Sequence, residues 1–107
     1  MNRLIIALLG SLLYSGASMA QKQTYFTNPV IHGDVADPSI LRIDDTYYVT
    51  GTSSEWAPYY PVFTSKDLVN WKQTGHVFEQ QPEWTKSSFW APEWYYHNGK
   101  VYVYYTA

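Results

Sequence analysis

The chain has 107 residues, with seven Lys or Arg, nine Asp or Glu and no Cys, for a formal net charge of -2. This mildly acidic balance excludes the basic surface that nucleic acids and anionic lipids require, so we expect neither as a partner. Without cysteine, no disulfide can compensate for a small hydrophobic core.

The first twenty residues differ from the rest of the chain. Arg3 supplies a positive charge, residues 4–13 are almost entirely apolar, and Ser18-Met19-Ala20 offers small residues to a signal peptidase. About ten apolar residues are fewer than the roughly 20 that span a bilayer, although a retained anchor stays the alternative. We predict a signal peptide over residues 1–20, cleaved before Gln21, and export to the periplasm or the cell exterior.

After an extended lead-in, the sequence alternates short β-rich runs with turn signals. No window supports a helix longer than two turns, so an all-β fold is predicted. Asp44-Asp45 and Asn98-Gly99 separate successive runs, and Asn-Gly readily adopts the positive φ values of a tight hairpin. The expected strands cover residues 39–43, 47–52, 61–65, 71–78, 94–96 and 101–106.

An internal repeat relates residues 37–52 to residues 91–106. At an offset of 54, Pro38 aligns with Pro92, Tyr48 with Tyr102, and the two turns with each other. A chance match of two hairpins in an aromatic-rich chain is the alternative. Self-similarity at this spacing, with about four short strands per unit, favours a propeller blade over a sandwich.

Residues 21–107 would then hold the first blade and the start of the second. Propellers close with about four to eight blades, and one isolated blade exposes an unpaired edge and little core. We therefore expect the 107 residues to be the N-terminal piece of a longer protein, poorly stable when isolated.

Asp37 is the first candidate for a catalytic residue. It precedes Pro38 at the start of an expected strand, and a proline disfavours helical geometry at the residue before it. Its carboxylate would be held at a strand end in one orientation, which suits a catalytic base. Simple turn formation by Asp-Pro is the alternative.

Aromatic residues suggest what such a base could act on. They make up 19% of the chain, with five Trp and eleven Tyr. Their flat apolar faces suit sheet packing, which we expect for most Tyr, or the stacking of sugar rings, which the Trp near strand ends could provide.

Six elements in order resemble the beginning of glycoside hydrolase family 43. Together they extend over essentially all of the chain after the predicted signal peptide. They are Asn28-Pro29-Val30 with Gly33, Asp37-Pro38-Ser39-Ile40, Tyr47-Tyr48, the run from Ser65 to Trp71, Gly75-His76-Val77, and Trp90-Ala91-Pro92.

The resemblance implies a five-bladed β-propeller that hydrolyses xylose- or arabinose-containing plant polysaccharides or oligosaccharides with inversion, in a funnel on its axis. It implies that Asp37 is the general base. The general acid, a glutamate, and an aspartate that tunes its pKa would lie in later blades, so Glu55 and Glu93 are left out of catalysis. Inversion requires two carboxyl groups about 6.5–9.5 Å apart, with a water between base and sugar.

The resemblance also implies that Trp90 and Trp56 contact the substrate. Trp71 and Asp67 are expected to be structural, Asp67 as the cap of a turn, and His32 to be an exposed loop residue. No zinc pattern is present. No cofactor is certain, and a structural calcium ion is possible in the full-length protein because some members of the family hold one.

Two other functions remain open. A non-catalytic carbohydrate-binding propeller, or an inactive fragment, would use the same Trp residues and leave Asp37 to hydrogen bonding. A retaining, sucrose-type hydrolase normally carries an Asn-Asp-Pro-Asn run, from which Ala36-Asp37-Pro38-Ser39 departs.

Overall fold

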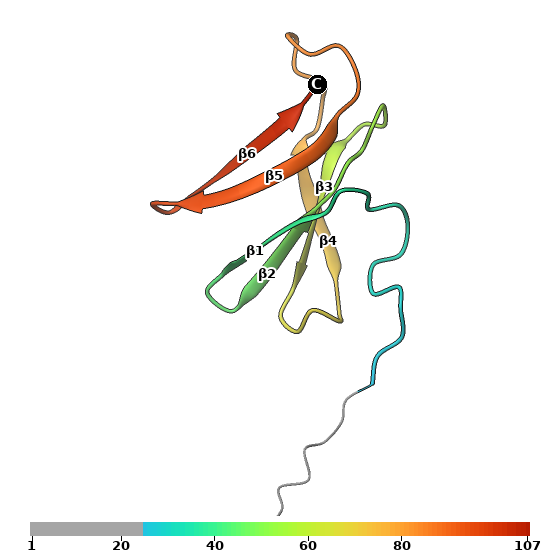
Figure 1. Ribbon diagram of the computed structural model, residues 1–107, viewed down its shortest axis with the longest axis vertical. Coiled ribbons are helices and arrows are strands. Elements are labelled where there is room, and N and C mark those ends of the chain that lie inside the picture. Colours follow the sequence, from blue (N-terminus) through green and yellow to red (C-terminus); the bar gives the residue numbers. More distant parts are fainter. Residues whose placement is uncertain (1–24) are drawn as a thin grey trace, which may run out of the picture.

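The computed structural model describes residues 25–107, which form six strands and no helix (Figure 1). The predicted signal peptide lies outside the described residues, and no helix within residues 25–107 could cross a membrane. The all-β prediction is confirmed. The strands are β1 (Ser39–Ile43), β2 (Thr46–Thr50), β3 (Tyr59–Ser65), β4 (Lys72–Phe78), β5 (Trp90–His97) and β6 (Lys100–Thr106).

Strands β1 to β4 form one antiparallel sheet in chain order, the arrangement of a propeller blade. The hairpin of β5 and β6 forms a second sheet, which lies beside the start of β1 (Figure 1). This hairpin repeats the geometry of β1 and β2. Asp44 and Asn98, which are related by the offset of 54, have φ values of 53° and 49°. The predicted repeat is therefore present in three dimensions.

Every strand after β1 has a boundary that differs from the prediction by one to four residues, and the two largest shifts at a strand start are those of β3 and β5. Strand β3 begins at Tyr59 instead of Pro61, and the aromatic rings of Tyr59 and Tyr60 are buried. Pro61 is tolerated inside β3 because β2 pairs only with the part of β3 from Val62 onward. Strand β5 begins at Trp90 rather than residue 94, with Pro92 accommodated at a register shift.

The core lies where the two sheets meet. The ring of Tyr59 stacks on that of Phe89 at 3.9 Å between centroids, and Tyr60 packs edge-on against Phe89 and Tyr105. The Tyr60 hydroxyl donates to the carbonyl oxygen of Thr106 at 3.0 Å, and burial raises the pKa of this phenol. These contacts fix the second hairpin against the blade.

A second hydrogen bond joins the sheets near the start of β1. The backbone N–H of Trp94 donates to the hydroxyl of Ser39 at 2.9 Å, and both residues are buried. Because Ser39 follows Asp37-Pro38, this contact places the candidate base at the junction of the two sheets.

The lead-in segment borders an apolar hollow on the blade. A cavity of about 770 Å³ lies between residues 28–35, the β1–β2 face at Ile40 and Val49, and the turn residues Leu68 and Trp71. The indole N–H of Trp71 donates to the carbonyl of Leu68 at 2.9 Å, which ties this ring to its own turn. The predicted structural role of Trp71 agrees with this contact.

Candidate active site

Asp37 lies in a bulge just before β1. The N–H of Thr52 donates to the carbonyl of Ala36 at 2.9 Å, and Ser39 pairs with Thr50, so Asp37 and Pro38 together face Gly51. The φ angle of Asp37 is 48°, in the left-handed region. The proline rule predicts an extended residue here. The bulge overrides it, and Asp tolerates this region better than most residues.

Gly51 permits this bulge, and the sequence alone did not identify it as important. A Cβ atom at residue 51 would lie 2.8 Å from Cγ1 of Val35 and 2.9 Å from the carbonyl oxygen of Ala36. Both distances are shorter than van der Waals contact, so a side chain here would push the Asp37 segment outward. The available signal was a glycine inside a β-rich run, which often marks a bulge or a close backbone approach.

The carboxylate of Asp37 is held by Thr52. The Thr52 hydroxyl donates to Oδ2 of Asp37 at 2.8 Å and accepts a hydrogen bond from the backbone N–H of Ala91, also at 2.8 Å. Ala91 follows Trp90 at the start of β5. Asp37 is solvent-exposed, yet one hydroxyl group links it to the Trp90-Ala91-Pro92 segment.

The two candidate tryptophans flank this link. Trp90 pairs with Thr106 and keeps 51% of its surface exposed. Trp56 is 80% exposed in the loop between β2 and β3, where its N–H donates to the carbonyl of Ser53 at 3.0 Å. A cavity of about 260 Å³ is lined by Trp56, Thr52 and Asp34 among others. Both tryptophans are therefore exposed within residues 25–107, Trp56 lining this cavity with Thr52 and Trp90 preceding Ala91, the partner of the Thr52 hydroxyl.

Glu55 fastens the Trp56 loop rather than facing the site. Its Oε1 accepts hydrogen bonds from the N–H of Ser88 at 2.8 Å and from the Ser88 hydroxyl at 3.2 Å. The neighbouring Ser54 pairs with Phe89. The prediction that leaves Glu55 out of catalysis agrees with this anchoring role. Glu93 is exposed on β5, opposite Tyr104.

The turn between β3 and β4 is organised by Asp67. Its Oδ1 accepts from the N–H groups of Val69 at 2.9 Å and Asn70 at 2.7 Å, and its Oδ2 accepts from the Asn70 side-chain amide at 2.7 Å. These bonds hold the pKa of Asp67 well below its usual range. The predicted capping role is confirmed.

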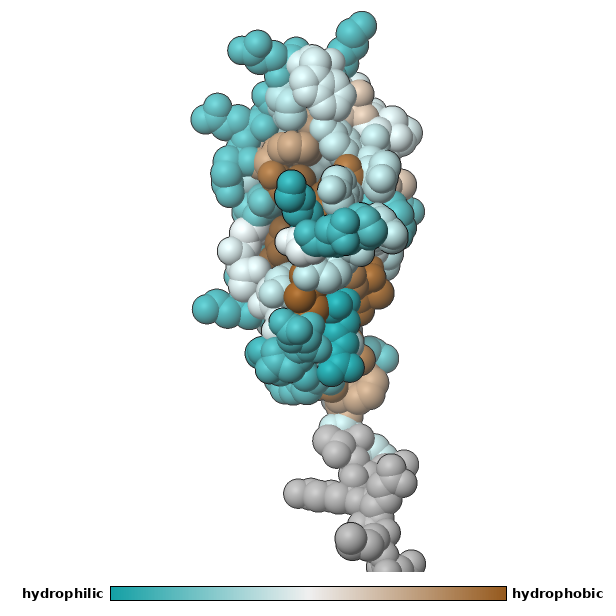
Figure 2. Space-filling model, turned by 90° about the vertical axis from the view of Figure 1, so that its left-hand side faces the viewer, coloured by the Kyte–Doolittle hydropathy of each residue, from teal (hydrophilic) through white to brown (hydrophobic). Residues whose placement is uncertain are grey.

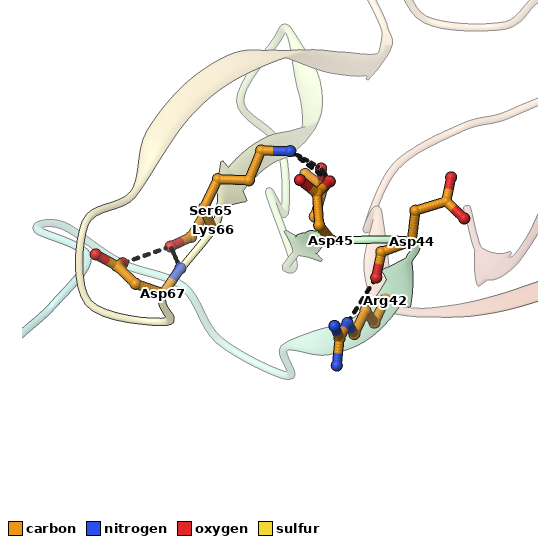
Figure 3. A network of polar contacts seen from close by, with 7 residues as sticks. Arg42, Asp44, Asp45, Ser65, Lys66 and Asp67 are labelled. Atoms are coloured by element: carbon orange, nitrogen blue, oxygen red, sulfur yellow. Dashed lines mark hydrogen bonds and ion pairs between the residues drawn. The ribbon is translucent and has the colours of Figure 1, made fainter.

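The same turn is tied to the β1–β2 turn. Ser65 donates to Asp67 at 3.0 Å, and Lys66 forms an ion pair with Asp45, as Figure 3 shows. The hydrogen bond from Lys66 lowers the pKa of Asp45. Apart from the buried Ser65, this network is solvent-exposed, and within residues 25–107 it makes no hydrogen bond or ion pair with Asp37 or Trp90, so we assign it to the structure of the blade.

Histidines and acidic residues form no metal site in the described part of the chain. Across residues 25–107, no three His, Asp or Glu side chains lie close enough to hold a metal ion. His76 instead contacts Gln73 at 2.9 Å and Glu79 at 3.7 Å, and His32 is exposed as predicted. Calcium binding by the full-length protein stays a prediction.

Comparison with known proteins gives one consistent result. A family profile described as "Glycosyl hydrolases family 43" matches residues 26–107. A non-reducing end alpha-L-arabinofuranosidase of Bacteroides ovatus is 40% identical over 94% of the chain, and a beta-xylosidase of Bacillus subtilis is 36% identical over 75% of it. The chain spans only 20% and 16% of the lengths of these two relatives.

Solved structures agree with the sequence relatives. One solved structure, described as "Bacteroides ovatus Xyloglucan PUL GH43B", matches with a TM-score of 0.66 at 39% sequence identity. The match covers 75% of this chain and 17% of that protein. A xylan beta-1,4-xylosidase from Bacillus halodurans gives a TM-score of 0.65 at 30% identity, covering 76% and 17%.

Proposed function

Because this chain belongs to glycoside hydrolase family 43, and so forms the first blade and part of the second blade of a five-bladed β-propeller, we propose that the full-length protein is an inverting glycosidase. Its substrates are xylose- or arabinose-containing plant polysaccharides or oligosaccharides. Asp37 is the general base. The general acid, a glutamate, lies beyond the residues of this chain.

One observation carries the proposal. The Asp37 carboxylate is held in place at the start of β1 by the Thr52 hydroxyl, which also bonds to the segment of Trp90. A base must be fixed within hydrogen-bond reach of the proton that it removes. The bulge before β1 and the Thr52 hydroxyl after β2 supply that fixation.

The chemistry follows from this placement. The Asp37 carboxylate accepts a proton from a water molecule while the water oxygen bonds to the anomeric carbon. The glycosidic C–O bond breaks as the protonated acid gives its proton to the leaving oxygen, and the configuration inverts. Trp90 and Trp56 offer exposed indole faces on which the sugar rings stack.

The relatives support the substrate class. The names of the curated relatives include alpha-L-arabinofuranosidase and beta-xylosidase, and one from Cellvibrio japonicus is an extracellular exo-acting arabinofuranosidase. The signal-peptide pattern of residues 1–20 supports export of this protein as well.

Product stereochemistry tests the proposal. The full-length protein is incubated with a panel of aryl β-xylosides and aryl α-L-arabinofuranosides, and the first-formed sugar is observed by NMR before it mutarotates. We expect hydrolysis of at least one series, with the anomer opposite to that of the substrate. Retention of configuration would contradict an inverting mechanism, and binding without hydrolysis would favour the carbohydrate-binding alternative.

A further inference from the structure

The hydrogen bonds of Thr52 indicate a role for this residue in the proposed reaction, and this inference rests on the proposed function. Asp37 precedes β1, Thr52 follows β2, and Ala91 belongs to β5 in the other sheet. Within residues 25–107, the Thr52 hydroxyl is the one group that hydrogen-bonds to both Asp37 and Ala91, at 2.8 Å in each case. We propose that Thr52 is a positioning residue that orients the general base and ties it to the Trp90 segment.

The direction of each hydrogen bond is fixed by the groups involved. A hydroxyl has a single proton to donate, and a backbone N–H can only donate. The N–H of Ala91 must therefore donate its hydrogen bond to the Thr52 hydroxyl, and that hydroxyl in turn donates a hydrogen bond to Oδ2 of Asp37. Bonds to a charged acceptor are stronger than neutral ones, and chained bonds reinforce each other.

This arrangement separates the two carboxylate oxygens of Asp37. Oδ2 is occupied by Thr52, whereas within residues 25–107 no hydrogen bond reaches Oδ1. Oδ1 is consequently the oxygen that accepts the proton of the attacking water. Because Thr52 also donates its backbone N–H to the carbonyl of Ala36 at 2.9 Å, its main chain is held independently of the bond to the carboxylate.

The internal repeat supplies a matched control. At the offset of 54, Ala91 occupies the position of Asp37, and Thr106 occupies that of Thr52. Both Asp37 and Ala91 have a left-handed backbone, with φ values of 48° and 43°. Residue 91 carries no carboxylate, so the hydroxyl of Thr106 has nothing equivalent to orient. Comparing the removal of the Thr52 hydroxyl with the removal of the Thr106 hydroxyl therefore separates two effects on turnover. One is the loss of orientation of Asp37, and the other is the replacement of a threonine at the end of such a hairpin.

The test compares Thr52→Val, Thr52→Ala, Thr52→Ser and Thr106→Val in the full-length protein, on an aryl glycoside that the wild type hydrolyses. We expect Thr52→Val to lower kcat by about ten- to a hundredfold, as misplacement of a catalytic group does. KM should stay within about threefold, because Thr52 acts on the base and not on the sugar. Thr52→Ser should restore most of the turnover, and Thr106→Val should match the wild type.

Several results would overturn the proposal. One is wild-type turnover in Thr52→Val, and another is an equal loss of turnover in Thr52→Ser and Thr52→Val. A third is a rise in the KM of Thr52→Val at unchanged kcat, which would make Thr52 a substrate contact. Thr52→Ala supplies a second hydroxyl-free side chain if Thr52→Val does not fold, as judged by circular dichroism.

A parallel Asp37→Asn variant distinguishes this inference from the proposed function. If that variant is inactive while Thr52→Val is normal, only the positioning role fails. If Asp37→Asn keeps wild-type turnover, the base assignment fails and the role of Thr52 fails with it. With both assignments correct, adding Thr52→Val to Asp37→Asn causes no further loss, since the two residues act as one unit.

Discussion

At the scale of single residues, the backbone conformation of Asp37 decides how the site can be probed. Its φ angle of 48° is one that Asp and Asn adopt more readily than other side-chain-bearing residues. Alanine at this position adds a backbone cost of about 1 kcal/mol to any loss of chemistry. Asp37→Asn is the cleaner variant because it removes the charge while keeping the preferred backbone.

Gly51→Ala tests the close approach that supports Asp37. The new methyl group would overlap Val35 and the carbonyl of Ala36, so we expect a loss of about 1–3 kcal/mol in stability, as for other overpacked sites. Turnover should fall as well, because the Asp37 segment must move. The measurements are the thermal midpoint and kcat of the full-length protein.

Gly75→Ala is the matched control for that experiment. Gly75 lies in β4, and a Cβ atom there would meet nothing within 4 Å. The control should retain turnover and stability. Equal losses in the two variants would show that the cost comes from replacing a strand glycine and not from crowding against Val35 and Ala36.

At the scale of elements, contacts between residues close in sequence could be predicted, whereas contacts between residues distant in sequence could not. The Asn98-Gly99 turn has φ values of 49° and 75°, as its composition indicates. Asp67 caps its turn because all of its partners lie within three residues. The positioning of Asp37 by Thr52, in contrast, joins residues that are distant in sequence and meet only when β1 and β2 pair and β5 packs beside them.

The β3–β4 turn carries a prediction about pH. Hydrogen bonds to the backbone and side chain of Asn70 lower the pKa of Asp67 in the folded state. A carboxyl group with a lowered folded pKa contributes stability above its unfolded value, about pH 4, and loses it as the pH falls towards the folded value. Asp67→Asn should therefore lower the thermal midpoint at pH 7, and the difference from wild type should shrink below about pH 4.

Asp44→Asn controls for the removal of one negative charge. Asp44 occupies the neighbouring hairpin turn, and its positive φ of 53° suits asparagine. Within the described residues its carboxylate accepts no hydrogen bond, since Arg42 contacts only its backbone carbonyl. A loss at pH 7 in Asp44→Asn as large as that in Asp67→Asn would contradict a specific capping effect.

At the scale of the whole molecule, much apolar surface stays uncovered. Only Val49, Tyr59, Tyr60, Phe89 and Trp94 are buried among the hydrophobic residues that the structure describes, whereas Ile40, Tyr95 and Tyr104 are more than half exposed. Figure 2 shows apolar residues reaching the surface between hydrophilic ones on the side toward which the β5–β6 hairpin extends. Such surfaces favour association over independent stability.

Isolated residues 21–107 should accordingly fail to fold alone. A two-stranded sheet is marginally stable in water, and a small core without disulfides supplies little stabilisation. We expect calorimetry to show no cooperative transition and sedimentation to show association. A single reversible transition from a monomer would contradict this expectation while leaving the assignment of Asp37 untouched.

The turnover of Asp37→Asn in the full-length protein tests the central claim most directly. With the fold verified by circular dichroism, removal of the general base should lower kcat on an aryl xyloside or arabinofuranoside by about 10²–10⁴-fold. A correctly folded Asp37→Asn enzyme with kcat within about threefold of wild type would show that residue 37 does not activate the attacking water.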